Sequence, residues 1–159
     1  MKSYNGNISK KTLDVAFQNV PGTLSHINKV TTIQSLVCRY QPDVLGLAEP
    51  STDDLDITWP DYTLVPGTVN NGNKNNTRLN ILIKNDIQYK QISWDTDVPH
   101  CVLEVKDWLI VMVYREWAKL GDQQTKSIDL QFQRWKTFVT NWKKQKGTKI
   151  IVRRVEKRL

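Results

Sequence analysis

A single carboxylate, Glu49, follows an apolar segment and is the first residue whose position suggests chemistry. Pro42 cannot continue a helix and favours an extended backbone in the residue before it. Residues 44–48 are apolar, which predicts a short strand covered on both faces. Glu49 would then lie at the carboxyl end of this strand, where α/β sheets place ligand-binding groups. Two interpretations stay open from this position: a metal ligand, or a solvated charge at a strand end.

The 159-residue length and 39% apolar content predict one globular domain with a sizeable core. No apolar run is long enough for a transmembrane helix, so we expect no membrane partner. Segment 1–11 lacks the pattern of a secretory signal, and we expect an intracellular protein, nuclear or cytoplasmic. Cys38 and Cys101 fit neither a disulfide framework nor a zinc site. Their apolar neighbours favour reduced cysteines in the core, without a disulfide partner.

The net charge of +7 is confined to the last part of the chain. Residues 1–142 hold 15 basic and 15 acidic residues, whereas residues 143–159 hold eight basic residues and only Glu156 as an acid. The body of the domain is therefore not basic, which gives little support for phosphate-backbone binding over the body itself. The basic end indicates a solvated segment, with weak nucleic-acid binding or a nuclear address as alternatives.

Hydrophobic periodicity predicts an α/β domain with a mixed sheet. The expected helices are 28–40 and 126–144, and the expected strands are 13–17, 44–48, 62–65, 78–84, 87–94, 101–105, 108–114 and one beginning at 149–152. Strands 78–84 and 87–94 are expected to pair as a hairpin, and so are 101–105 and 108–114, with 108–113 as a central strand. In helix 126–144, Trp135 and Trp142 share the apolar face, which favours core packing over base stacking.

Four segments stand in a recognisable order: QNVPG at 18–22, PDVLGLAE at 42–49, RLNILIK at 78–84 and VMVYREW at 111–117. Together they resemble the amino-terminal half of the endonuclease/exonuclease/phosphatase superfamily, and more narrowly the apurinic-type endonuclease domain of non-LTR retrotransposons. The resemblance spans roughly residues 12–152, with 1–11 as a loose leader and 153–159 as a basic tail outside the family pattern. It implies a DNase I-like α/β sandwich of two sheets flanked by helices, here incomplete.

The resemblance also implies a phosphodiesterase that uses Mg²⁺ or Mn²⁺ and acts on nucleic acid, DNA more than RNA. Glu49 would be a metal ligand, and Asn19 a neutral hydrogen-bonding group at the phosphate or metal site. Tyr114 would direct its hydroxyl at the scissile phosphate, with Arg115 in support. This set suits phosphodiester hydrolysis, which needs a metal for the developing charge and donors around the phosphoryl oxygens.

The sequence departs from the family after the strand that begins at 149–152. The family continues there with Gly-Asp-x-Asn, whereas this chain reads Arg153-Arg154-Val155-Glu156. The later Ser-Asp-His segment has no counterpart, and we interpret the upstream His26 and His100 as structural or solvated. Glu156 lies in a basic run with no turn glycine before it, which disfavours it as a replacement carboxylate. Loss of these groups should cost many orders of magnitude in rate.

Three functions follow from these observations. The favoured one is a truncated metal-dependent phosphodiesterase domain of retroelement origin that is catalytically impaired. The alternatives are an active Mg²⁺-dependent endonuclease and a non-catalytic nucleic-acid-binding remnant.

Overall fold

The computed structural model describes residues 12–20, 26–48, 59–68, 78–94, 98–116, 129–130, 133–134, 136–137, 139–141, 144 and 149–157. The elements, in chain order, are β1 (Val15–Asn19), α1 (His26–Tyr40), β2 (Val44–Ala48), β3 (Tyr62–Pro66), β4 (Leu79–Lys84), β5 (Lys90–Ile92), β6 (His100–Val105), β7 (Trp108–Glu116) and β8 (Lys149–Lys157). No helix among these residues is long and apolar enough to cross a membrane.

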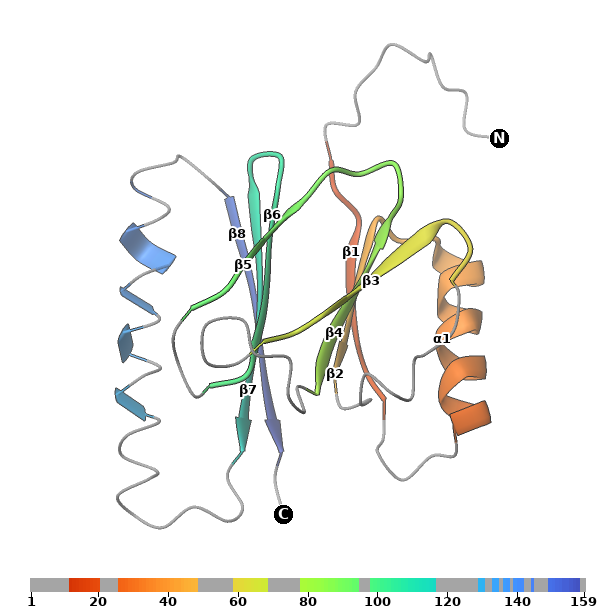
Figure 1. Ribbon diagram of the computed structural model, residues 1–159, viewed down its shortest axis with the longest axis horizontal. Coiled ribbons are helices and arrows are strands. Elements are labelled where there is room, and N and C mark those ends of the chain that lie inside the picture. The colour runs from red at the N-terminus through yellow and green to blue at the C-terminus, as the bar shows by residue number, and fades with distance from the viewer. Residues whose placement is uncertain are drawn as a thin grey trace.

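The strands form two four-stranded sheets that pack face to face (Figure 1). The first sheet has the order β1-β2-β4-β3, in which β1 and β2 are parallel and β4 is antiparallel to both of its neighbours. The second sheet has the order β5-β6-β7-β8, in which β7 and β8 are parallel. The predicted α/β sandwich with mixed sheets is therefore confirmed.

The main core lies between the two sheets. Alternate residues of β4, such as Ile81 and Ile83, meet Leu103 of β6 and Ile110 of β7 in this layer. The sheets approach closely at Gly46, where an added Cβ would lie 2.5 Å from a ring carbon of Phe17 and 2.6 Å from the sulfur of Met112. Gly46 is thus needed for space, because the Phe17 ring occupies the position of its missing side chain.

Helical segments cover the outer faces of both sheets (Figure 1). On the first sheet, Ile33 of α1 packs with Leu45 and Leu82. On the second, Val139 packs against a cluster that includes Leu109 and Val111. The described residues within the predicted helix 126–144 are helical, but Trp135 and Trp142 lie outside the described residues.

The predicted hairpin of strands 78–84 and 87–94 is wrong. β4 pairs with β2 and β3, and β5 pairs with β6 in the other sheet. β4 is central in the first sheet, so both of its hydrogen-bonding edges are taken by β2 and β3 and none is left for β5. The short β5 is exposed or half-buried and serves as an edge strand.

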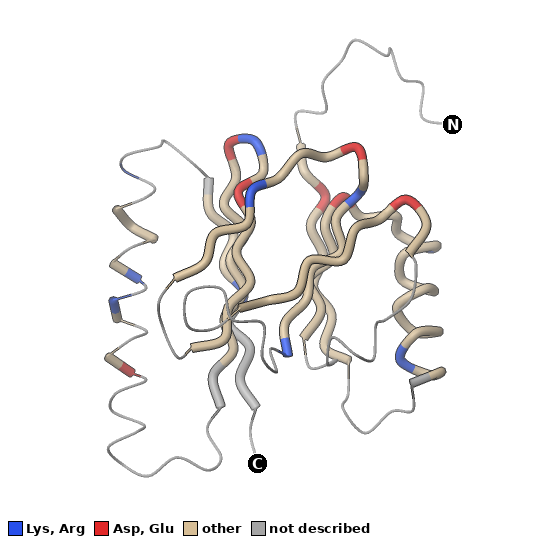
Figure 2. Tube along the Cα trace, in the orientation of Figure 1, with Lys and Arg blue, Asp and Glu red and all other residues tan. Residues whose placement is uncertain are grey.

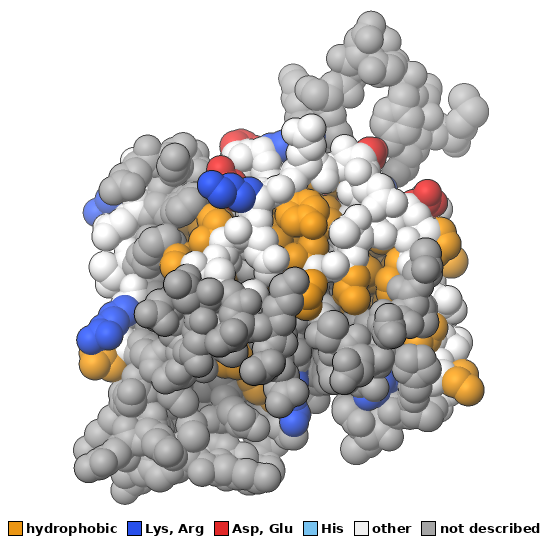
Figure 3. Space-filling view, viewed as in Figure 1, with side chains coloured by type: hydrophobic (Ala, Val, Ile, Leu, Met, Phe, Trp, Pro, Cys, Tyr) orange, Lys and Arg blue, Asp and Glu red, His pale blue; other side chains and the backbone are white. Residues whose placement is uncertain are grey.

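Apolar side chains reach the surface on the face that carries β3 and β5 (Figure 3).

The second predicted hairpin is confirmed. β6 and β7 pair in register from His100 with Val113 to Val105 with Trp108, and β7 is central in its sheet, as predicted. Lys106 has a φ of 54° in the tight turn between the two strands.

The described charged residues lie mostly near the edge of the sandwich that carries the β6–β7 turn (Figure 2).

Candidate functional site

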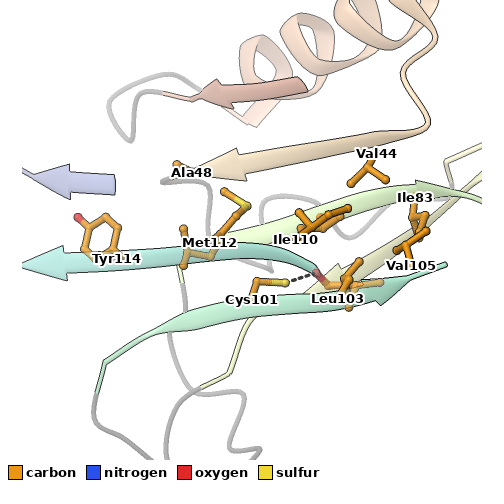
Figure 4. Packing of buried hydrophobic residues seen from close by; sticks show 12 residues of the cluster. Val44, Ala48, Ile83, Cys101, Leu103, Val105, Ile110, Met112 and Tyr114 are labelled. Carbon is orange, nitrogen blue, oxygen red and sulfur yellow. Dashed lines mark hydrogen bonds between the residues drawn. The ribbon is translucent and has the colours of Figure 1, made fainter. Parts of the chain in front are cut away.

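The carboxyl ends of β1, β2 and β7 meet at the opposite edge of the sandwich. Asn19 pairs with Ala48 at the end of the parallel β1–β2 ladder, and Val20 extends this pairing by donating its N–H to the Ala48 carbonyl oxygen, 2.8 Å away. Ala48 and Tyr114 belong to the same buried cluster between the sheets and lie near each other in Figure 4. Because Leu79 of β4 pairs with Ala48, the fold brings one end of each of the four predicted segments to this edge.

Asn19 is exposed at the last position of β1, so its amide can reach a ligand in solvent. Its backbone carbonyl accepts a hydrogen bond from Gln18 Nε2 at 2.9 Å. Glu49 follows Ala48, the last residue of β2, but Glu49 itself lies outside the described residues. The role of Glu49 as a metal ligand stays a prediction.

Tyr114 is buried, with 2% of its surface exposed, and its ring lies in the layer between the two sheets. In Figure 4 the ring stands on the side of β7 that faces β2, at the Ala48 end. Burial places Tyr114 at this edge but within the core, and its role toward a phosphate stays a prediction. The backbone of Arg115 belongs to β7, and its side chain lies outside the described residues.

β8 runs alongside β7 at this edge and continues through Lys157. The parallel register pairs Met112 with Arg153, Tyr114 with Val155 and Arg115 with Glu156. Residues 153–156 therefore continue the strand at the place where the family resemblance expects a Gly-Asp-x-Asn turn. The predicted boundary between the domain and a tail at 153 stays a prediction, although the backbone of residues 153–157 forms part of the sheet.

Hydrogen bonds between Thr68 and His100 connect the two sheets at the Asn19–Tyr114 edge. Thr68, just after β3, forms an isolated bridge with His100 at the start of β6, and each donates its N–H to the carbonyl of the other at 2.7 and 2.9 Å. The Thr68 hydroxyl also lies 3.2 Å from His100 Nε2 and 3.1 Å from the Ser93 hydroxyl. Gly67 permits this crossing, because an added Cβ would lie 2.9 Å from the carbonyl oxygens of both His100 and Leu79.

His100 has a structural role, as expected from the sequence. The backbone N–H of Trp94 donates to Nε2 at 3.0 Å, so Nε2 is unprotonated and the proton is on Nδ1, which donates to the Val98 carbonyl at 2.8 Å. The side chain is fully buried, and burial lowers the pKa of His100. A neutral imidazole held on both nitrogens is a poor candidate for proton transfer. The side chain of His26, at the start of α1, lies outside the described residues.

A buried polar residue that the sequence analysis did not select also lies near this edge. Asn80 is fully buried in β4 and pairs with Leu47, two positions before Glu49 in the chain. The available signal was a lone amide within the apolar run of RLNILIK. Asn80 is therefore a further polar group that could position residues at the end of β2.

Asp43, the acidic residue of the Pro42-Asp43 motif, lies at the opposite edge of the sandwich, where its side chain holds neighbouring strands together. Its Oδ2 accepts the backbone N–H of Asp14 at 2.9 Å, and its Oδ1 lies 3.4 Å from Lys84 Nζ. Beside it, the Tyr62 hydroxyl donates to the Pro42 carbonyl at 2.7 Å. Burial, and next the charge of Asp43, raises the pKa of Tyr62. The motif thus ties the starts of β1 and β2 to the end of β4.

A cavity of about 420 Å³ lies at this Asp43 edge, away from the predicted site. It is lined by Gln34, Val37, Cys38, Gln41, Trp59, Pro60, Asp61, Tyr62 and Lys84. The indole N–H of Trp59 is buried and has no acceptor among the described residues.

The two cysteines differ in their environment. Cys101 is buried in the core, as predicted, and its thiol donates to the Val65 carbonyl at 3.7 Å. The prediction that Cys38 also lies in the core is wrong, since it is exposed on α1. It follows the buried Ile33 by five residues, about 140° around the helix, which turns it away from the sheet.

The described residues at the Asn19–Tyr114 edge do not form a metal site by themselves. No group of three or more His, Cys, Asp or Glu side chains within the described part of the chain could hold a metal ion. The edge contributes one exposed amide and one buried hydroxyl, and hard divalent cations prefer carboxylate oxygen. A role for Glu49 in supplying such a carboxylate stays a prediction.

Comparisons with solved structures agree with the fold. Truncated TDP2 from Caenorhabditis elegans matches with a TM-score of 0.53 and 15% identity over 84% of this chain and 57% of that one. The 3′ phosphatase NExo from Neisseria, bound to a product DNA hairpin, matches with a TM-score of 0.55 and 16% identity over 90% and 57%. An endonuclease/exonuclease/phosphatase family protein from Bacteroides thetaiotaomicron matches with a TM-score of 0.50 and 14% identity over 89% and 62%.

These matches show that the chain has the fold of endonuclease/exonuclease/phosphatase proteins, as the sequence resemblance implied. The chain spans only 57% of the length of truncated TDP2 and of NExo. By sequence, no protein-family profile matches it, and no curated protein matches it.

Proposed function

We propose that this chain is a partial metal-dependent phosphodiesterase domain, of retroelement origin, that meets DNA at the Asn19–Tyr114 edge and is impaired in hydrolysis. The pairing of β8 with β7 carries the proposal. Residues 153–156 run beside Met112 to Arg115 as strand, where the resemblance expects the Asp and Asn that hold the attacking water and the phosphate. Without these groups, positioning and general acid–base help are both lost.

The proposed contacts with a phosphate come from this chain's own residues. The exposed amide of Asn19 would donate to a phosphoryl oxygen, and the Tyr114 hydroxyl would donate from the core side. Glu49 would hold Mg²⁺ or Mn²⁺, which would supply a positive charge to the phosphoryl oxygens when bound. Arg115 would support the phosphate from β7.

The choice of DNA is supported by two proteins that share the fold. NExo was solved with a product DNA hairpin, and Danio rerio TDP2, with a TM-score of 0.51 and 15% identity, was solved with a single-stranded DNA product. The retroelement origin is supported only by the order of the motifs and the YREW sequence at 114–117.

A non-catalytic DNA-binding domain is the second candidate, and the exposed Arg153 on β8 favours it over an active endonuclease. Arg153 lies on the strand beside Met112 and adds a cation near the proposed phosphate position. Both candidates predict binding without cutting, and they differ in whether a metal strengthens the binding.

Binding of a fluorescent single-stranded DNA, followed by anisotropy with and without Mg²⁺, tests the proposal. We expect Asn19→Ala to weaken binding by about tenfold or more, because a hydrogen bond to a charged phosphate is lost. The matched control is Asn141→Ala, at an exposed position of the helical segment 129–144. Equal affinities of the wild type, Asn19→Ala and Asn141→Ala would contradict binding at this edge. Stronger binding in Mg²⁺ that is lost in Glu49→Ala supports the metal site over the non-catalytic alternative.

A further inference from the structure

β8 offers a long backbone edge for pairing. It is nine residues long and stands last in the sheet order β5-β6-β7-β8. Every residue from Lys149 to Lys157 is in register with a residue of β7, so the strand is held along its whole length. Among the described residues β7 is its only strand partner. Within this described part of the chain, the side of β8 opposite β7 presents backbone donors and acceptors on which a further strand could form.

The two faces of this edge carry different side chains. Val152 is 53% exposed and lies beside Val111, a member of the outer-face cluster. Arg153 is exposed and lies beside Met112, a member of the cluster between the sheets. An added strand would therefore meet an apolar side chain on one face and a cation on the other.

The charge of β8 argues against a second copy as the partner. The strand has four basic residues and one acidic residue. Antiparallel pairing of two copies about Arg153 would place Arg153 opposite itself and Lys149 opposite Lys157. Like charges directly across a strand pair are destabilising, and Lys or Arg on an edge strand commonly prevents self-association. A strand with carboxylates would instead find opposite charges at these positions.

We propose that the edge of β8 opposite β7 binds an acidic, extended segment of another polypeptide as an additional strand. Its backbone pairs with β8, an apolar residue packs on Val152, and a neighbouring carboxylate faces Arg153. In this mode the backbone hydrogen bonds supply affinity and the alternating side chains supply specificity. The proposal does not depend on phosphodiester hydrolysis or on a metal.

The test uses the whole chain and a fluorescent eight-residue peptide of alternating Glu and Val with blocked ends. We expect saturable binding by anisotropy, together with slower hydrogen exchange of the amides in 149–157. A peptide with Lys in place of Glu should bind at least about tenfold more weakly, because opposite-charge pairs across the strands become like-charge pairs. Because this comparison leaves the protein unchanged, it does not depend on how a variant folds.

Arg153→Glu should weaken binding of the acidic peptide by about tenfold and strengthen binding of the Lys peptide. The matched control is Lys136→Glu, an exposed charge in the helical segment, which should leave both affinities within about twofold of the wild type. Equal effects of the two variants would overturn the proposal, since they would reflect only net charge.

Three other results would also overturn the proposal. The first is no saturation by the acidic peptide at about 1 mM, the weak limit for a specific contact. The second is protection of the same β8 amides by a single-stranded oligonucleotide, which would assign the edge to nucleic acid. The third is a dimer in sedimentation with β8 protected in the absence of peptide, which would assign it to a second copy.

Discussion

Asp43 is the acid of the PD motif, and the structure predicts that its substitution affects stability rather than site chemistry. Its carboxylate is buried, with 3% of the residue exposed. It accepts the Asp14 N–H at 2.9 Å and lies 3.4 Å from Lys84 Nζ, whose side chain is 25% exposed. We therefore expect Asp43→Ala to lower the free energy of unfolding without weakening DNA binding at the opposite edge.

The magnitude follows from these two contacts. A hydrogen bond to a charged group contributes about 1.5–3 kcal/mol, and a partly exposed ion pair adds up to about 1 kcal/mol. Asp43→Ala should thus cost about 1.5–4 kcal/mol, a large share of the stability of a domain this size. Asp43→Asn keeps an oxygen for the Asp14 N–H and should cost about 1–2 kcal/mol. Lys84→Met should cost no more than about 1 kcal/mol.

Urea denaturation followed by tryptophan fluorescence measures these differences, with the slope of the transition checked for two-state behaviour. The order expected is Asp43→Ala, then Asp43→Asn, then Lys84→Met. A cost below about 0.5 kcal/mol for Asp43→Ala would refute the reasoning, because such a value is typical of a surface substitution. Weaker DNA binding by folded Asp43→Asn would refute the separation of this motif from the site.

Three further predictions concern the packing between the sheets and the buried histidine. Gly46→Ala should cost about 1–3 kcal/mol in urea denaturation because its Cβ would meet the Phe17 ring at 2.5 Å. The same substitution should cost less in a Phe17→Ala background, and an equal cost in both backgrounds would contradict the contact. Gly67→Ala should cost a similar amount, but truncating a side chain should not rescue it, since its Cβ would meet backbone oxygens at 2.9 Å; a neutral result would argue against the Thr68–His100 crossing. Burial lowers the pKa of His100, so the unfolded chain takes up a proton that the folded chain does not. Stability should therefore fall as pH drops through about 6.5, by at most about 1.4 kcal/mol per pH unit, and His100→Gln should flatten the profile; an unchanged profile would show that His100 is not the group responsible.

The sequence predicted the elements whose local pattern matches their environment. Residues 44–48 are apolar without interruption and form β2, which is buried throughout. The turn at Lys106 and Asp107 separates two apolar runs and joins β6 to β7. In such segments the pattern of apolar and polar residues along the chain predicts which residues are buried.

Strand partners and the role of Asp43 could not be predicted in the same way. β4 and β5 are close in sequence, and nothing in their residues shows that one is central in the first sheet and the other at the edge of the second. Asp43 was part of a recognisable motif, but only the fold shows that it binds Asp14 and Lys84 at the edge opposite Asn19. These features depend on contacts between distant segments, which a local pattern does not contain.

The candidate site was predicted in part. Asn19 and Tyr114 were chosen by resemblance, and the fold places both at the edge where β2 ends at Ala48. The burial of Tyr114 was not foreseen because it depends on the packing of the two sheets against each other. The continuation of β8 through residues 153–156 was not foreseen because it depends on the pairing of β8 with β7. Asn80 was not selected from the sequence, because a single amide within an apolar strand does not by itself indicate a functional residue.

We propose that the Asn19–Tyr114 edge belongs to a phosphodiesterase-like site that is impaired in hydrolysis. Nicking of supercoiled plasmid in Mg²⁺ or Mn²⁺ tests it most directly, with wild type, Glu49→Ala and Tyr114→Phe purified in parallel. We expect all three preparations to give the same background of nicked plasmid. Nicking by the wild type that disappears in Glu49→Ala would contradict it and would establish an active metal-dependent endonuclease.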